Sequence, residues 1–260
     1  MPKTGELLDK NRIISLLPDG LKDIDLCIFD CVDSTNNLAK KLILDGAAKF
    51  TAIIAEQQTA GRGRLGRSFY SPANTGLYMT LILNPKLATP EEIQLITVMA
   101  AVAARRSIAK FSQNEPKIKW VNDIFIGDKK VCGILAEAVS IGSSIAGIAL
   151  GIGINCSTES FPRELECIAA SIGSNHISRN ALAAEIIQNI AELSADISSP
   201  HTLEEYKNNC LTLGKTVLFN RDGNDVFAVA YGINSNGNLM VKEENGNETT
   251  LFYGEAVIVD

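Results

Sequence analysis

The sequence contains few of the residues that mark metal, histidine or nucleic-acid chemistry. It has two histidines, His176 and His201, neither of which lies in a motif, and six cysteines without a C-x-x-C pair. This spacing predicts no zinc site, and a histidine-based mechanism is not indicated. The formal net charge of −6 lacks the basic excess that general nucleic-acid binding requires. We therefore expect no nucleic-acid partner.

Long hydrophobic runs are also missing. The two longest candidates, 93–104 and 145–156, are too short and too mixed in polarity to span a bilayer. The N-terminal residues 1–6 contain no apolar core of a signal peptide. We expect a soluble, cytoplasmic protein with reduced cysteines and no membrane partner.

The most informative segment that is present is 57–67, which reads QQTAGRGRLGR. It follows the apolar run 51–55 and contains three glycines and three arginines within its last seven residues. Glycine lets the backbone approach a ligand closely, and the planar guanidinium group matches the oxygens of a phosphate or carboxylate. The segment therefore predicts a loop that binds an anion.

The same glycines, at positions 61, 63 and 66, fit the dinucleotide fingerprint G-x-G-x-x-G. That fingerprint requires a helix directly after the third glycine. Residues 67–76 contain a proline and read as turns, which argues against a dinucleotide site. When residues 57–67 are considered alone, a surface loop that binds no ligand remains the simpler alternative.

Four further segments combine polar residues with apolar runs. Residues 33–36 read DSTN before an expected helix, where Ser34 or Thr35 would make an ordinary N-cap. Residues 117–123 read KIKWVND, 133–137 read GILAE and 151–155 read GIGIN. Taken singly, each is more typical of a helix start or a core strand than of a site.

Read in order from about residue 29 to the C-terminus, the five segments resemble the biotin protein ligases. The resemblance implies an enzyme that joins biotin to ATP, retains biotinyl-5′-AMP and transfers the biotinyl group to a carrier lysine. Its substrates would be biotin and ATP with Mg²⁺. Its partner would be a biotin carboxyl carrier domain of acetyl-CoA carboxylase or of another biotin-dependent carboxylase. The resemblance leaves a monomer or a homodimer open.

The resemblance also implies roles for individual residues. Biotin contacts fall on Ser34, Thr35, Asn36, Gln58, Gly61, Arg62, Gly63, Arg64, Lys119 and Gly133. Nucleotide contacts fall on Arg64, Arg67, Phe69, Asn122 and Asn155. The catalytic residues would be Lys119, Arg64 and Arg62, because fixed cations offset the repulsion between two anions and stabilise charge on the α-phosphate. Metal ligands are not indicated.

Three positions depart from the family pattern. Val121 stands where the family usually has proline, which should loosen the local backbone. Leu65 replaces a frequent arginine, and Phe69 replaces a tryptophan. None of these changes removes a residue with an implied chemical role.

The expected architecture is α+β, with helices against a mixed sheet in the class II aminoacyl-tRNA synthetase-like manner, followed by a small SH3-like β-barrel. We expect a catalytic domain over 1–212 and the barrel over 213–260, where Asn-Gly pairs at 236–237 and 245–246 indicate hairpins. Expected helices cover 11–17, 35–44, 91–111, 179–195 and 203–209. About 25 residues precede the first expected strand, too few for a DNA-binding helix-turn-helix domain, so we expect the monofunctional form.

Two other functions share this fold. A lipoate or octanoate ligase or transferase would carry a different loop, with two adjacent arginines before paired glycines, and the sequence RGR at 62–64 argues against it. A catalytically inactive, ligase-like binding protein would be expected to have lost Lys119 or Arg64, and both are present.

Overall fold

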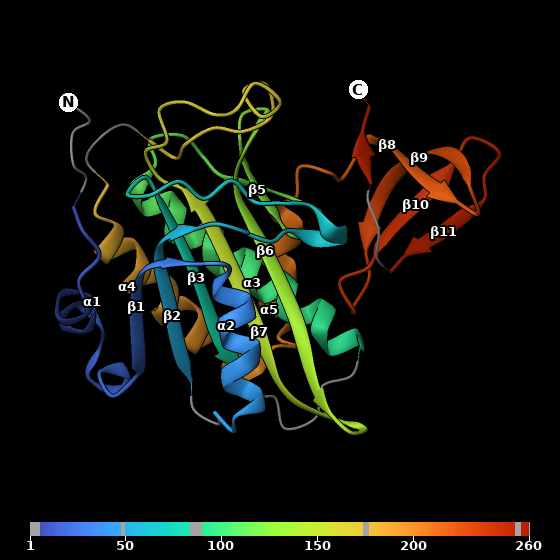
Figure 1. Ribbon diagram of the computed structural model, residues 1–260. Helices are drawn as coiled ribbons and strands as arrows, with labels where there is room; N and C mark the ends of the chain where they lie inside the picture. The colour runs from blue at the N-terminus through green and yellow to red at the C-terminus, as the bar shows by residue number, and fades with distance from the viewer. Residues whose placement is uncertain (1–5, 48–49, 84–89, 174–176, 253–255, 260) are drawn as a thin grey trace.

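The computed structural model describes residues 6–47, 50–83, 90–173, 177–252 and 256–259. A seven-stranded sheet in the order β1-β2-β3-β7-β6-β5-β4 forms the centre of the larger part (Figure 1). β1 pairs in parallel with β2, and the other neighbours pair antiparallel, so the expected mixed sheet is confirmed. The strands are β1 (Asp25–Val32), β2 (Thr51–Gln58), β3 (Gly76–Leu83), β4 (Lys117–Lys119), β5 (Asp123–Ile126), β6 (Lys129–Ile141) and β7 (Ser144–Asn155).

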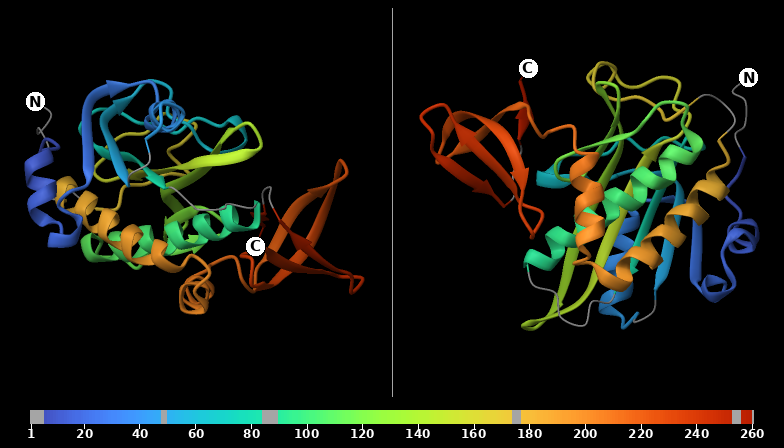
Figure 2. Two further views of the ribbon diagram at one scale, coloured as in Figure 1. Left: turned by 90° about the horizontal axis from the view of Figure 1, so that it is seen from below. Right: turned by 180° about the vertical axis from the view of Figure 1, so that it is seen from behind.

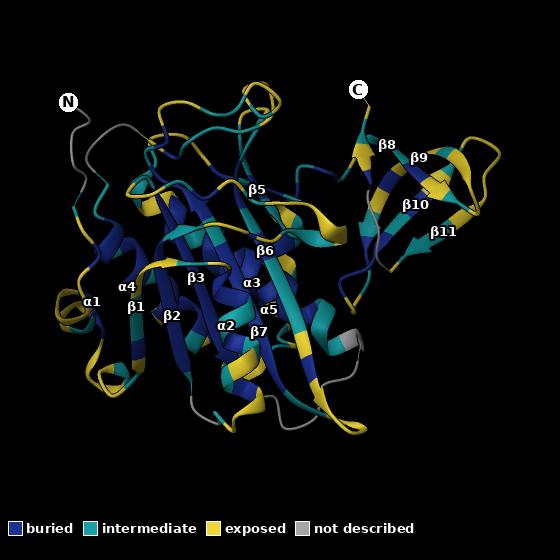
Figure 3. Ribbon diagram, viewed as in Figure 1, coloured by how far each residue is buried: buried dark blue, intermediate teal, exposed yellow. Residues whose placement is uncertain are grey.

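Helices cover both faces of this sheet. α2 (Thr35–Leu44) lies on one face, and α3 (Pro90–Phe111), α4 (Arg179–Leu193) and α5 (Pro200–Asn208) lie on the other (Figures 1 and 2). α1 (Lys10–Leu16) packs beside α4. Successive strand residues point to opposite faces, so Ile53 packs under α2 while Ile54 joins the larger core. The central strands β2 and β3 and most of β7 are therefore buried on both sides, as Figure 3 shows.

The C-terminal part is a five-stranded antiparallel sheet in the order β11-β10-β9-β8-β12. Gly237 and Gly246, with φ of +79° and +88°, occupy the two hairpin turns that the Asn-Gly pairs predicted. β5 and β12 were not predicted, because they are only four and two residues long. The strands are β8 (Thr216–Arg221), β9 (Asn224–Ile233), β10 (Leu239–Glu243), β11 (Glu248–Leu251) and β12 (Val257–Ile258).

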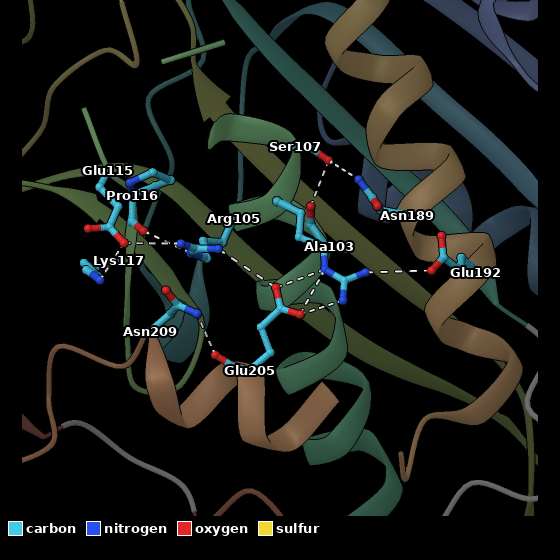
Figure 4. Close-up of polar contacts among 11 residues, drawn as sticks. Ala103, Arg105, Ser107, Glu115, Pro116, Lys117, Asn189, Glu192, Glu205 and Asn209 are labelled. Atoms are coloured by element: carbon cyan, nitrogen blue, oxygen red, sulfur yellow. Dashed lines mark hydrogen bonds and ion pairs between the residues drawn. The ribbon is translucent and has the colours of Figure 1, made fainter. Parts of the chain in front are cut away.

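α5, which leads to the C-terminal part, is fixed to α3 by an ion-pair cluster (Figure 4). The Arg106 guanidinium contacts the Glu205 carboxylate at 2.5 Å and 3.0 Å, and these hydrogen bonds raise the pKa of Arg106. Arg105 lies 3.9 Å from the same carboxylate and donates to the Pro116 carbonyl oxygen at 3.2 Å. The cluster thus joins α3, α5 and the approach to β4.

A buried ion pair holds β2, α4 and the N-terminal segment together. Arg179 Nη1 lies 2.6 Å from Glu56 Oε2, and the two side chains are only 3% and 9% exposed. The other Glu56 oxygen accepts from the Leu8 backbone N–H at 2.8 Å, and Arg179 also donates to the Glu6 carbonyl oxygen at 2.6 Å. Each charge is therefore compensated on more than one side.

Among the helices in the described part of the chain, none combines the length and the apolar character that crossing a membrane requires.

Arg179→Met should lower the free energy of unfolding by about 3–5 kcal/mol, because it leaves the Glu56 carboxylate buried without a counter-charge. Urea denaturation measures this loss. The control is Lys22→Met, whose pair with Asp19 is exposed and should contribute less than about 1 kcal/mol. Equal losses in the two variants would contradict the structural importance of the buried pair.

Candidate functional site

A cavity lies at the end of the large sheet where β2 and β7 end and β3 and β6 begin. Its walls come from the start of α2, the Gly-Arg loop and these four strands. The lining residues are Ser34, Thr35, Asn36, Gln58, Arg62, Gly63, Arg64, Phe69, Tyr78, Met79, Asn122, Lys130, Gly133, Ile134, Leu135, Gly151, Ile152 and Gly153. The structure thus gathers most of the residues that the sequence indicated, from segments more than a hundred positions apart.

One part of the wall is polar and uncharged. Ser34 occupies the N-cap position of α2 and is almost fully buried, yet its side chain makes no capping hydrogen bond. The Thr35 backbone N–H donates to Gln58 Oε1 at 2.8 Å, and Gln58 Nε2 donates to Ser71 Oγ at 3.0 Å. The helix start therefore does not use the Ser34 hydroxyl, which argues against the simple N-cap interpretation.

Asn36 is held from two directions. Its amide nitrogen donates to Glu137 Oε2 at 2.9 Å, and its amide oxygen accepts from Thr80 Oγ1 at 2.6 Å. Burial acts to raise the pKa of Glu137, but hydrogen bonds from Lys40 and Asn36 outweigh it and leave the pKa below its ordinary value. Asn36 thus forms a fixed polar corner of the cavity, with both of its amide atoms engaged by protein groups.

Three cations also line the cavity. Arg64 Nη1 donates to Asn122 Oδ1 at 2.9 Å. Lys130 Nζ lies 2.7 Å from Asp123 Oδ1, and Arg62 Nη1 donates to Asn37 Oδ1 at 3.0 Å. Of the lining residues that the structure describes, these three are cationic and none is acidic. The cavity therefore favours a ligand that carries an anionic group.

The Phe69 ring packs against the sheet at two glycines, which have no side chains to obstruct it. Gly133 and Gly153 face each other across β6 and β7. A Cβ at Gly153 would stand 2.7 Å from the Phe69 ring, so only glycine allows the ring to lie this close there, and a Cβ at Gly133 would make a tight contact of 3.2 Å. Together with Ile134 and Ile152, the ring gives the cavity lining an apolar part.

The Gly-Arg loop is folded on itself. The Gly63 N–H donates to the Arg67 carbonyl oxygen at 2.8 Å, and the Phe69 N–H donates to the Gly61 carbonyl oxygen at 2.9 Å. Residues 67–75 form no helix, as the argument against a dinucleotide site required. A Cβ on Gly61 would stand 2.5 Å from the Phe69 carbonyl oxygen, which explains the glycine there.

Four of the indicated residues do not line the cavity: Gly61, Arg67, Lys119 and Asn155. Arg67 is exposed, and Asn155 is buried with its amide nitrogen 3.2 Å from the Ala170 carbonyl oxygen. Lys119 Nζ lies 5.4 Å from the centre of the Phe125 ring, within the β4–β5 hairpin. Of the two histidines, His201 belongs to α5 and His176 lies outside the described residues.

Lys130 is the charged residue of the cavity lining that the sequence argument missed. It is the second residue of β6, three positions before Gly133, and it belongs to the cavity lining. Thr80 and Glu137, which hold Asn36, were missed as well. The spacing of Lys130 from Gly133 was visible in the sequence, but the strand β5 that turns this segment back toward the site was not recognised.

Comparison with known proteins gives two family matches. The model described as the biotin/lipoate A/B protein ligase family matches residues 28–155, and the biotin protein ligase C terminal domain matches residues 212–259. Residues 28–155 therefore carry the domain of the biotin/lipoate A/B protein ligase family, and the two matched segments together are those of a biotin protein ligase.

Individual relatives agree with this assignment. A bifunctional ligase/repressor BirA of Bacillus spizizenii is 32% identical over 89% of this chain, which spans only 65% of the length of that relative. A biotin–[acetyl-CoA-carboxylase] ligase of Mycobacterium tuberculosis is 28% identical, over 79% of this chain and 77% of the relative. The fold matches that of a biotin protein ligase from Aquifex aeolicus in complex with biotin and ATP, with a TM-score of 0.75, 24% identity, and coverage of 90% and 98% of the two chains.

Glu137→Gln should make stability less sensitive to acid. The folded-state pKa of Glu137 is lowered, so its stabilisation is complete above the ordinary unfolded-state pKa of about 4.3 and is lost as pH falls through the folded value. Unfolding free energies at neutral pH and below about pH 4 measure the difference. Parallel pH profiles for the variant and the parent would contradict this role.

Proposed function

We propose that the chain is an ATP-dependent ligase that activates biotin as biotinyl-5′-AMP and transfers the biotinyl group to a carrier lysine. The observation that carries the proposal is the set of groups that line one cavity. Uncharged hydrogen-bonding groups, apolar side chains and three cations all contribute to its lining. Biotin offers a matching group to each: a neutral ureido ring, an apolar ring and chain, and a carboxylate.

In this proposal the ureido group contacts the polar wall formed by Ser34, Thr35 and Gln58. Hydroxyl and amide groups can donate to the ureido oxygen and accept from its N–H groups, so a neutral ligand needs no charged partner there. Phe69 and Ile152 would lie along the apolar part of the ligand. Asn36 and Gly133 would shape the pocket through their positions in its wall.

The carboxylate end lies near Lys130 and Arg64, where it meets the α-phosphate of ATP. Attack of the carboxylate oxygen on the α-phosphorus forms the mixed anhydride and releases pyrophosphate. Fixed cations lower the repulsion between the two anions and stabilise the charge that grows on the phosphoryl oxygens. No general base is required, since a carboxylate is already ionised at neutral pH.

Three other nucleotide assignments stay proposals: Arg67, Asn122 and Asn155. Asn122 lines the cavity and holds Arg64, which supports a position near the phosphates. Arg67 and Asn155 lie away from the lining, so their roles would require the loop or the nucleotide to reach past the present wall. Lys119 would act from outside the present lining in the same way.

Magnesium would enter with the nucleotide. Within the described residues, no group of three or more histidine, cysteine, aspartate or glutamate side chains is placed to hold a metal ion. The two carboxylates beside the cavity, Asp123 and Glu137, are already paired with Lys130 and Lys40. MgATP is therefore the substrate form that we propose, with the ion on the phosphates.

The acceptor that we propose is a lysine of the biotin carboxyl carrier domain of acetyl-CoA carboxylase or of another biotin-dependent carboxylase. The lysine amine attacks the biotinyl carbonyl carbon, the amide forms, and AMP leaves. An acyl-adenylate is readily hydrolysed, so the folded Gly-Arg loop, with Arg62 and Arg64, would shield it until the carrier arrives. The name of the Mycobacterium relative supports this acceptor class.

Lys130→Ala should raise the barrier to adenylate formation by about 2–4 kcal/mol, the range for loss of one fixed charge that stabilises a transition state. Biotin-dependent exchange of labelled pyrophosphate into ATP measures this step. Lys119→Ala is the comparison, and its effect should be smaller because its ammonium group lies outside the lining. A larger effect at Lys119 would return the catalytic role to that residue.

Arg64→Ala should release biotinyl-AMP faster, because it removes a cation that lines the cavity and the hydrogen bond to Asn122. The measurement is the rate at which preformed adenylate leaves the enzyme without a carrier. A variant that retains adenylate as long as the parent would remove the loop from the shielding role.

A further inference from the structure

A turn of the C-terminal domain, residues 234–238 between β9 and β10, packs against the large domain. The Gly237 carbonyl oxygen accepts from Trp120 Nε1 at 3.0 Å and from Gln94 Nε2 at 3.2 Å. Gly237 is buried, and a Cβ there would stand 2.7 Å from a Val98 methyl group on α3. Asn234 Oδ1 accepts from two backbone N–H groups of the turn at 3.0 Å, which keeps the turn in one shape.

The segment that receives this turn is held residue by residue. The Trp120 backbone N–H donates to Thr212 Oγ1 at 3.0 Å, in the connection that leads to the C-terminal domain. The Tyr206 hydroxyl of α5 donates to the Val121 carbonyl oxygen at 3.0 Å. Trp120 and Val121 are 5% and 2% exposed, so the backbone at the position where the family has proline is not loose.

The next residue, Asn122, reaches the cavity. Its backbone carbonyl oxygen accepts from the Ile134 N–H at 2.9 Å, and its side-chain nitrogen donates to the Ile134 carbonyl oxygen at 2.8 Å. Its side-chain oxygen accepts from Arg64 Nη1 at 2.9 Å. A continuous series of short contacts therefore runs from Gly237 through Trp120 and Asn122 to Arg64. The fixed acceptor for the Arg64 side chain depends on a backbone that the C-terminal turn helps to hold.

We infer that the turn 234–238 is a positioning element for Arg64: it fixes Trp120 and hence Asn122, from which Arg64 is aimed at the cavity. A long arginine side chain loses much rotamer freedom when it is held, so a mobile Asn122 would leave the guanidinium spread over several positions. Functional side chains require such support from neighbouring groups to keep productive geometry. The consequence for adenylate retention rests on the proposed function.

The test compares two glycines that share a backbone conformation. Gly237→Ala strains a positive-φ turn and forces a methyl group against Val98, which should lift the turn from Trp120. Gly246→Ala, in the β10–β11 turn, imposes the same kind of backbone strain with nothing within 4 Å of the added methyl group. The control thus separates undocking of the turn from weakening of the C-terminal domain.

The first measurement needs no ligand. Amide hydrogen exchange is followed in the peptide that covers the loop 61–68, where the Gly63 and Arg67 N–H groups are hydrogen-bonded. We expect the exchange rate in Gly237→Ala to exceed that in Gly246→Ala by about fivefold or more. Trp120 is the single tryptophan of the chain, so its emission should shift to longer wavelength in the first variant only. Equal exchange in both variants would overturn the inference, whatever the enzyme's activity.

The second measurement is the rate of biotinyl-AMP release. It should rise about fivefold or more in Gly237→Ala and stay at the parent rate in Gly246→Ala. In an Arg64→Ala background, Gly237→Ala should add no further increase, because the turn acts through Arg64. Additive effects would show a merely structural role and overturn the inference.

Trp120→Phe provides a second route if Gly237→Ala does not fold. It keeps an aromatic ring but removes the N–H that bonds Gly237, and it should change loop exchange and adenylate release in the same direction. Unchanged exchange and release in a folded Trp120→Phe variant would contradict the inference. A parent protein that forms no adenylate from biotin would overturn the proposed function alone, because the exchange measurement still decides the positioning role.

Discussion

The site depends on a stripe of β7 that contains three glycines. Gly147, Gly151 and Gly153 lie on the same face, and a Cβ at these positions would meet Ile43, Asn36 and Phe69 respectively. Ile43 and Asn36 belong to α2, so the glycines let this helix approach the sheet closely and place its N-terminal residues over the strands. Gly153 allows an aromatic ring to line the cavity. A Cβ at Gly151 would stand 2.2 Å from Asn36 Oδ1 and one at Gly153 would stand 2.7 Å from the Phe69 ring, so a side chain at either position would displace a wall of the cavity.

The charged groups around the cavity are arranged to leave it cationic. The carboxylates nearest to the lining, Glu137 and Asp123, each pair with a lysine and so do not oppose an anionic ligand. Arg62 and Arg64 come from the folded loop, whereas Lys130 comes from a strand. Cations from the loop and from the strand can then act together on an anionic ligand, where the low local dielectric strengthens their effect.

Much of the fold and part of the site could be predicted from the sequence. Apolar runs and Asn-Gly turns located the long strands and both late hairpins, and the Gly-Arg loop, Ser34 and Gln58 were correctly brought to one cavity. The sequence singled out Lys119 and not Lys130, whose place in the cavity lining depends on the short strand β5 reversing the chain. The contact of Trp120 with Gly237 joins residues 117 positions apart and has no local signal.

The proposed function depends on which acid the cavity selects, and exchange of labelled pyrophosphate into ATP tests this selection most directly. The folded protein with MgATP is given biotin, lipoate, octanoate or no acid in separate reactions. Exchange with biotin alone is the predicted result, because the neutral polar wall matches a ureido ring. Exchange with lipoate or octanoate would contradict the pocket assignments, and no exchange with any acid would identify a ligase fold without catalysis.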